Sequence, residues 1–149
     1  MAYLVDTSIL GRLANSADRD YAVALRAVIE LHRRGDVLHV APQNLIEFRT
    51  AATRPTAVNG LGLSAVEAEA KTSDFEVAFP LLVQTLDIYP AWKALVGALG
   101  VTGKQVHDAR LVAICHLNCI SHLLTFNTMH FKRLAVHAPG IVVVDPATV

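Results

Sequence analysis

The chain has 149 residues, of which 53% are hydrophobic, and its 13 basic and 13 acidic side chains give a formal net charge of zero. This length predicts a single domain over residues 1–149, and the composition excludes an intrinsically disordered chain. The charge excludes a surface that is basic overall, so any nucleic-acid footprint must be local. No apolar run reaches the length of a membrane span and no secretory signal pattern is present, so we expect a cytoplasmic protein without a membrane partner.

Helical and strand-like patterns alternate along the chain. The first strand is predicted at residues 2–5, an uncharged apolar run typical of a strand buried on both faces of a parallel sheet. Further strands are predicted at 37–41, 80–83, 122–125 and 141–144. Helices are predicted at 7–15, 19–34, 42–53, 64–79, 91–99, 106–119 and, as a short helix or turn, 127–134. This alternation predicts an α/β fold with a parallel sheet.

Several helix boundaries have clear local causes. Pro42 suits the first turn of a helix, and Ser64 with Glu67 forms a capping-box pattern. Gly35 follows three basic residues, which is typical of a helix C-terminus. Arg54 precedes a proline, which disfavours helical backbone at that residue, so this helix is predicted to end there.

Cys115 and Cys119 are the only cysteines, and they lie four residues apart in a mostly apolar predicted helix. This spacing puts both on one face, and we interpret them as reduced core residues. A zinc site that also used His116 and His122 is the alternative, but the spacing matches none of the usual structural zinc patterns.

Asp6 lies where the first predicted strand ends, and Thr7 and Ser8 follow it. In open α/β sheets the carboxyl ends of the strands face the crevice where ligands bind. Asp is also a good N-cap, so Asp6 has two interpretations at this point: a helix cap or a ligand-binding carboxylate.

Two other acids stand out by their positions. Asp108 continues the apolar stripe of Val112 and Cys115 on its helix, so its carboxylate is predicted to point toward the buried side. An unpaired buried carboxylate costs several kcal/mol, so a compensating cation or set of donors is expected. Glu47 has polar neighbours, which allows an ordinary solvated side chain. It nevertheless lies in the helix after the second strand, within reach of the sheet edge that carries Asp6.

Three carboxylates at one crevice repel each other unless a divalent cation joins them. Carboxylate oxygens suit Mg²⁺ or Mn²⁺, and such an ion can bind a phosphate oxygen and lower the pKa of a bound water. The chemistry that this pattern predicts is metal-assisted hydrolysis of a phosphodiester.

Four segments resemble the motifs of the PIN domain family. Residues 4–8 (LVDTS) resemble its opening, 45–48 (LIEF) its second acidic motif, 103–113 (GKQVHDARLVA) its third and 124–131 (LTFNTMHF) its fourth. Their order and spacing are similar to those of the small VapC-type toxins of bacterial toxin–antitoxin pairs. The resemblance covers essentially the whole chain.

This resemblance implies a PIN-like three-layer fold, with a parallel sheet in the order 3-2-1-4-5 and helices on both faces. It also implies an Mg²⁺- or Mn²⁺-dependent endoribonuclease that leaves 5′-phosphate and 3′-hydroxyl ends. Carried over residue by residue, Asp6, Glu47 and Asp108 would be the catalytic and metal-binding carboxylates. Family members are typically homodimers that a cognate antitoxin protein inhibits.

The fourth motif departs from the family pattern. The positions that often supply a further carboxylate hold Asn127 and His130. Asn127 can orient a water through its amide, or it can be an ordinary turn residue after a strand. The loss of one negative charge argues against a second metal ion. Thr7 and Ser8 are predicted to support the site through their hydroxyls.

Local basic residues are the candidates for RNA contact. We select them for their positions near the acidic motifs: Lys104, Arg110, Arg12, Arg49, Arg54 and His130. Lys104 ranks first, because its Gly-flanked loop precedes the helix that carries Asp108. A solvated surface position is the ordinary alternative for each of them.

Other classes of protein fit the sequence less well. A dinucleotide-binding domain is disfavoured because Gly60-Leu61-Gly62 lacks a third Gly and follows no strand. The main rival is a catalytically silent PIN-like module that binds protein or RNA. We also predict a homodimer with an apolar interface, for which the helix at 91–99, with Trp92 and Leu95, offers apolar surface.

Overall fold

A four-stranded parallel sheet lies at the centre of the protein, in a computed structural model that describes residues 1–149. The strands are β1 (Ala2–Val5), β2 (Val37–His39), β3 (His122–Leu124) and β4 (Val142–Val144), in the spatial order β2-β1-β3-β4. Leu4 is in register with His39 of β2 and with Leu123 of β3, so β1 is an inner strand. The mixed α/β class and the parallel sheet are confirmed.

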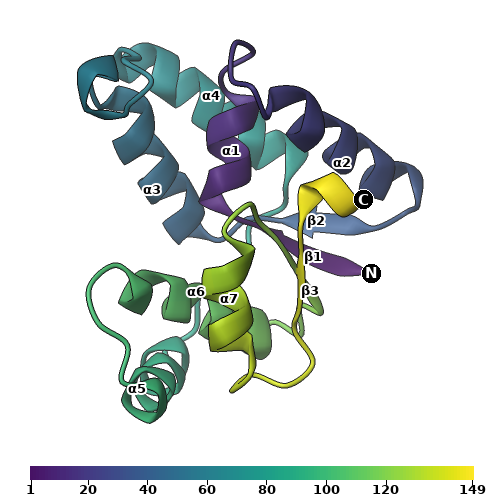
Figure 1. Ribbon diagram of the computed structural model, residues 1–149, viewed down its shortest axis with the longest axis vertical. Helices are drawn as coiled ribbons and strands as arrows, with labels where there is room; N and C mark the ends of the chain where they lie inside the picture. Colours follow the sequence, from purple (N-terminus) through teal and green to yellow (C-terminus); the bar gives the residue numbers. More distant parts are fainter.

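Helices cover both faces of this sheet (Figure 1). On one face lie α1 (Thr7–Leu13), α2 (Tyr21–Arg33), α3 (Pro42–Thr53), the 3-10 turn η1 (Thr56–Val58) and α4 (Ala65–Ala78). On the other lie α5 (Ile88–Leu99), α6 (Gln105–Leu117) and α7 (Thr128–Ala135), and the 3-10 turn η2 (Pro146–Thr148) ends the chain. The three-layer arrangement places α1 and α3 above the edge of the sheet at which the strands end.

Two hydrophobic cores fill the space between the layers. Successive side chains of a strand point to opposite faces, so Tyr3 and Val5 pack under α1 to α4 while Leu4 packs under α5 to α7. All three are buried, which explains why β1 is a continuous apolar run and shows no alternating pattern. The strand that ends at Asp6 is therefore held rigidly between both cores.

The predicted strand at 80–83 is only an isolated bridge. Leu81 pairs in parallel with Val40, directly after β2, through hydrogen bonds from Val40 N to Pro80 O (3.2 Å) and from Leu82 N to Val40 O (2.9 Å). Pro80 has no N–H to donate and Val83 is exposed, so the ladder does not extend. The predicted order 3-2-1-4-5 is thus correct in its neighbours, with its first strand reduced to this bridge.

The α5 and α6 boundaries differ from the prediction. Helix α5 begins at Ile88, three residues early, because Pro90 falls in its first turn, where its missing N–H costs nothing. Helix α6 ends at Leu117, and Cys119 lies beyond it in left-handed backbone (φ 54°) with an exposed side chain. The prediction that both cysteines are core residues is therefore wrong for Cys119. Cys115 is buried, and burial raises the pKa of its thiol to about 12.

The apolar face of α5 packs inside the protein. Leu95 is buried in the second core and Trp92 packs against it, with its indole N–H donating to Val106 O (2.7 Å). The surplus apolar surface lies instead just before and at the start of α5, where Leu86 is 95% exposed and Tyr89 is 63% exposed. None of the helices combines the length and apolar character that crossing a membrane requires.

Candidate functional site

The candidate site forms where β1 and β3 end side by side. Asp6 follows β1 and Thr125 follows β3, and the Asp6 amide donates to Leu124 O (3.0 Å). Both side chains are buried at this edge, with Asp6 4% exposed and Thr125 fully covered. The parallel pairing thus brings together two polar residues that lie 119 positions apart in the sequence.

Asp6 is both a helix cap and a site carboxylate. Its Oδ2 accepts hydrogen bonds from Ser8 Oγ (2.6 Å), Thr125 Oγ1 (2.7 Å) and Ser8 N (3.3 Å), the last as N-cap of α1. Its Oδ1 makes none of these contacts. Burial raises the pKa of Asp6, and the hydrogen bonds from Ser8 and Thr125 oppose that rise. None of the six ion pairs of the chain includes Asp6.

Glu47 projects from the second turn of α3 and is held by two neutral donors. Thr7 Oγ1 donates to Glu47 Oε2 (2.9 Å), and Gln43 Nε2, one turn earlier on α3, donates to Glu47 Oε1 (2.8 Å). Asn44 Nδ2 donates to Thr7 Oγ1 (3.3 Å), which leaves the Thr7 hydroxyl hydrogen for Glu47. Neither donor neutralises the Glu47 charge.

Gln43 connects Glu47 to the helix that carries Asp108. The same Nε2 also donates to His107 O (2.9 Å), and Gln43 Oε1 accepts from Arg110 (2.8 Å). Arg110 in turn donates to Gln84 Oε1 (2.8 Å). Gln43 is buried, so this chain of hydrogen bonds fixes both its amide and the Glu47 carboxylate.

Asp108 lies in the first turn of α6 and is half-buried. Burial raises the pKa of Asp108 to about 6, and repulsion from Asp6 and Glu47 adds to the rise. Electrostatic interactions with His130 and His107 lower the pKa of Asp108. The effect of Asp6 and Glu47 on the pKa of Asp108 indicates that both carboxylates lie within electrostatic range of Asp108.

One cavity of about 450 Å³ contains all three carboxylates. Of the predicted residues it is lined by Asp6, Thr7, Ser8, Arg12, Glu47, Arg54, Asp108 and Asn127. Helices α1 and α3 form its two walls, and the loop after α3 and the turn after α1 extend it away from the carboxylates. Asn127 N donates to Thr125 Oγ1 (2.9 Å), so its backbone is tied to the hydroxyl that binds Asp6.

Four of the basic candidates do not line this cavity. Arg49 forms an ion pair with Glu69 of α4, and Arg110 is engaged by the two glutamines described above. Lys104 and His130 are exposed outside the cavity wall. Of the six basic candidates, Arg12 and Arg54 line the cavity that contains the carboxylates.

The donor set of the cavity fits a hard divalent cation. It includes carboxylate and hydroxyl oxygens, and Asp6, Glu47 and Asp108 form none of the ion pairs of the chain. Repulsion from Asp6 and Glu47 adds to the effect of burial on the pKa of Asp108. As the side chains stand, no group of three or more His, Cys, Asp or Glu side chains is arranged to hold one ion.

Sequence reasoning missed three polar residues of the site. Thr125 occupies the strand end beside Asp6, and a hydroxyl residue directly after an apolar strand was the available indication. Gln43 lies one helical turn before Glu47, a spacing that predicts contact on any helix. Asp18 lines the far end of the cavity, and nothing in its local sequence indicated this because the turn after α1 places it there.

Solved structures with this fold include two VapBC proteins and a VapC toxin. The VapBC2 complex from Rickettsia felis bound to a promoter DNA fragment matches with a TM-score of 0.70 and 16% identity, over 97% of this chain and 98% of that one. VapBC-1 from nontypeable Haemophilus influenzae also matches with a TM-score of 0.70 and 16% identity, over 98% of both chains. VapC20 from Mycobacterium tuberculosis, described as a sarcin–ricin loop cleaving toxin, matches with a TM-score of 0.64 and 20% identity, over 87% of this chain and 93% of that one.

At these identities the structural likeness shows the fold alone. No curated protein sequence matches the chain. The sequence pattern of the PIN domain, however, matches residues 3–136, a span that includes all four acidic-motif segments and every residue of the carboxylate site. The chain therefore belongs to the PIN domain family.

Proposed function

We propose that this protein is a divalent-metal-dependent endoribonuclease and the toxin of a toxin–antitoxin pair. One observation carries the proposal: Asp6, Glu47 and Asp108 come from three separate parts of the chain, line one cavity, and form no ion pair with a basic side chain. Its likeness to VapBC complexes and to a sarcin–ricin loop cleaving toxin supports the toxin assignment, a cognate antitoxin and an RNA substrate. A cytoplasmic location and a single domain over residues 1–149 are part of this proposal.

Asp6 and Asp108 would hold Mg²⁺ or Mn²⁺, and Glu47 would accept a hydrogen bond from water in the same cavity. When bound, such a cation neutralises the carboxylates, polarises a phosphate oxygen and makes water a better nucleophile at neutral pH. No Ser-His or Cys-His pair lines the cavity, which agrees with attack by water. Because the fourth motif offers the neutral Asn127, we expect one cation per site.

The surrounding side chains fix the carboxylates in place. Ser8 and Thr125 hold one oxygen of Asp6, which leaves the other for the cation. Thr7 and Gln43 hold Glu47, and Asn127 lines the cavity at the end of β3, where its amide can orient water or a phosphate oxygen. These contacts are made before substrate binds, so the site pays little reorganisation energy during the reaction.

A titration with Mn²⁺ separates this function from a catalytically silent binding module. Calorimetry of the full-length protein is expected to show one ion per chain for the wild type, and much weaker binding for Asp6→Ala and Asp108→Asn. Full-length protein that takes up no Mn²⁺ while still binding RNA or a protein partner would favour the silent module.

The homodimer is proposed from exposed apolar side chains near the start of α5. Leu86 and Tyr89, together with Trp92, line an apolar hollow of about 460 Å³. Exposed apolar patches of this kind mark protein interfaces. We expect a dimeric mass by light scattering for the wild type and a monomeric mass for Leu86→Asp. Val66→Asp changes an equally apolar exposed side chain at the start of α4, and it is expected to stay dimeric. A wild-type monomer at micromolar concentration contradicts the proposal.

Replacing Gln43 with Leu is expected to lower the cleavage rate about 10- to 100-fold, the usual loss when a residue that orients a metal-site carboxylate is removed. The change deprives Glu47 of its Oε1 donor and leaves Arg110 with one fewer acceptor. Gln84→Ala is the matched control, because Gln84 also binds Arg110 but does not touch Glu47. Initial rates of RNA cleavage measure both variants. Equal losses in the two variants would show that Arg110, and not Glu47, explains the effect.

A further inference from the structure

Arg12 is an incompletely paired guanidinium in the wall of the carboxylate cavity. Its Nε is buried and has no hydrogen-bond partner. The nearest anion is Asp18, whose Oδ1 lies 3.9 Å from Arg12 Nε, which is too long for a hydrogen bond. A buried donor without an acceptor is costly, so an acceptor that the free protein lacks would be bound favourably here.

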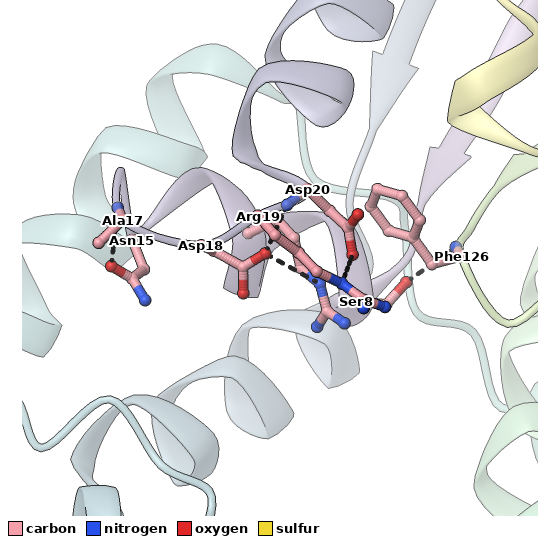
Figure 2. A network of polar contacts seen from close by, with 8 residues as sticks. Ser8, Asn15, Ala17, Asp18, Arg19, Asp20 and Phe126 are labelled. Atoms are coloured by element: carbon pink, nitrogen blue, oxygen red, sulfur yellow. Dashed lines mark hydrogen bonds and ion pairs between the residues drawn. The ribbon is translucent and has the colours of Figure 1, made fainter.

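Asp18 is held by hydrogen bonds of its own turn. Its Oδ1 accepts from the Asp20 amide (2.9 Å), and its carbonyl accepts from the Tyr21 amide (3.1 Å) at the start of α2. Figure 2 shows Asp18 in this turn, with Asp20 and Arg19 beside it. Asp18 therefore contributes negative potential next to Arg12 without completing its hydrogen bonds.

Phe126 fixes the guanidinium from the other side and links it to the carboxylates. The Arg12 guanidinium lies over the Phe126 ring, 5.5 Å from its centroid, in a cation–π contact. The Phe126 amide donates to Ser8 Oγ (3.2 Å, Figure 2), and the same hydroxyl donates to Asp6. The position of Arg12 relative to Asp6 is thus set by the fold.

The separation of Arg12 from Asp6 indicates which ligand it serves. The two residues are six positions apart across α1, which corresponds to about 9 Å along a helix axis. Arg12, Asp6 and Asp108 line the same cavity, so an RNA strand that has one phosphate at the two carboxylates brings a neighbouring phosphate toward Arg12. The planar fork of a guanidinium suits the bidentate recognition of phosphate.

We propose that Arg12 binds an RNA backbone phosphate next to the one being cleaved, and that Asp18 is the internal anion with which this phosphate competes. This inference rests on the proposed function, since it assigns part of the same cavity to RNA. Arg12 raises the affinity for RNA and Asp18 lowers it. Removal of the Arg12 charge therefore weakens RNA binding, and removal of the Asp18 charge strengthens it. If Arg12 and Asp18 formed only a structural ion pair, the two replacements would not change RNA affinity in opposite directions.

Binding of a fluorescein-labelled oligouridylate tests this, measured by fluorescence anisotropy over a range of salt concentrations. All proteins carry Asp108→Asn so that the RNA stays intact. Adding Arg12→Gln is expected to weaken binding about tenfold and to reduce the slope of log affinity against log salt by about 0.7, the value for one single-strand phosphate contact. Arg19→Gln is the matched control, because Arg19 lies in the same turn but is 91% exposed outside the cavity. It is expected to leave the slope nearly unchanged.

Asp18→Asn keeps the acceptor for the Asp20 amide and removes only the charge, so it is expected to bind the oligouridylate several-fold more tightly. Circular dichroism shows whether Arg12→Gln is folded. If it is not, Asp18→Asn still tests the inference. If the parent binds RNA but Arg12→Gln matches Arg19→Gln, or Asp18→Asn does not tighten binding, the inference is wrong while the proposed function stands. If the parent binds no RNA at any salt concentration, the proposed function fails as well.

Discussion

Asp108→Asn is expected to lower RNA cleavage by more than about 100-fold, beyond the loss typical of residues that only orient a metal ligand. The same variant is expected to keep or slightly raise its stability in chelator. Asparagine retains the shape of the side chain but lacks the charge that repels Asp6 and Glu47. Cleavage rates and urea unfolding of the same preparation measure both effects.

The stability effect has a defined dependence on pH. The folded protein raises the pKa of Asp108 to about 6, so it binds this proton more tightly than the unfolded chain does. Metal-free wild-type protein therefore loses stability as pH rises from about 4 to about 6, and the loss persists at pH 7. Asparagine cannot ionise and avoids this loss.

Two effects keep the gain in the free energy of unfolding of Asp108→Asn small. Partial exposure of the carboxylate reduces the pKa contribution to about 1–2 kcal/mol, and the lost interaction with the α6 dipole offsets about 0.3–1 kcal/mol of it. In chelator at pH 7, Asp108→Asn should thus unfold at an equal or higher urea concentration than wild type. Below about pH 4 the advantage should vanish. A loss of several kcal/mol in chelator would show that Asp108 is a structural residue.

Asp6→Ala is expected to abolish cleavage and also to destabilise the protein. Asp6 accepts hydrogen bonds from the hydroxyls of Ser8 and Thr125 and caps α1, so its removal leaves buried donors without an acceptor. Such losses cost about 1–3 kcal/mol, of which the removal of a buried charge returns a part. Activity and urea unfolding in chelator are the measurements.

Asp145→Ala provides the matched control for Asp6. Asp145 also caps a helical turn, by accepting from the Ala147 amide, but it does not line the cavity. Its replacement is expected to leave cleavage unchanged. If Asp6→Ala keeps full activity, or if Asp145→Ala loses as much, capping alone would account for Asp6.

Asp6 shows which features of the site the sequence could predict. The apolar run before Asp6 identified a buried strand, and strand ends in parallel sheets meet at one edge, so the site position followed. The sequence left open whether Asp6 is a cap or a site residue. The structure shows that Asp6 does cap α1, through Oδ2, while Oδ1 makes none of those contacts and is the oxygen we propose for the cation.

Other features depended on contacts between distant segments. Gln43 is fixed by His107 and Arg110, which lie more than sixty positions away, so its role is visible only after α3 and α6 pack together. The segment at 80–83 has a strand-like composition, but it meets only Val40, since β2 ends one residue earlier. Cys119 was misplaced because α6 ends two residues before it, and helical spacing no longer applies there.

Initial rates of RNA cleavage against Mg²⁺ concentration test the central claim most directly. The assay uses purified full-length protein free of antitoxin, single-stranded and structured RNAs, and the Asp6→Ala and Asp108→Asn variants. The three carboxylates predict a rate that rises with single-site saturation, that vanishes in chelator and returns with Mg²⁺ or Mn²⁺, and that is lost in both variants. RNA that stays intact under all these conditions, or cleavage that survives both chelator and Asp6→Ala, would contradict a metal-dependent ribonuclease.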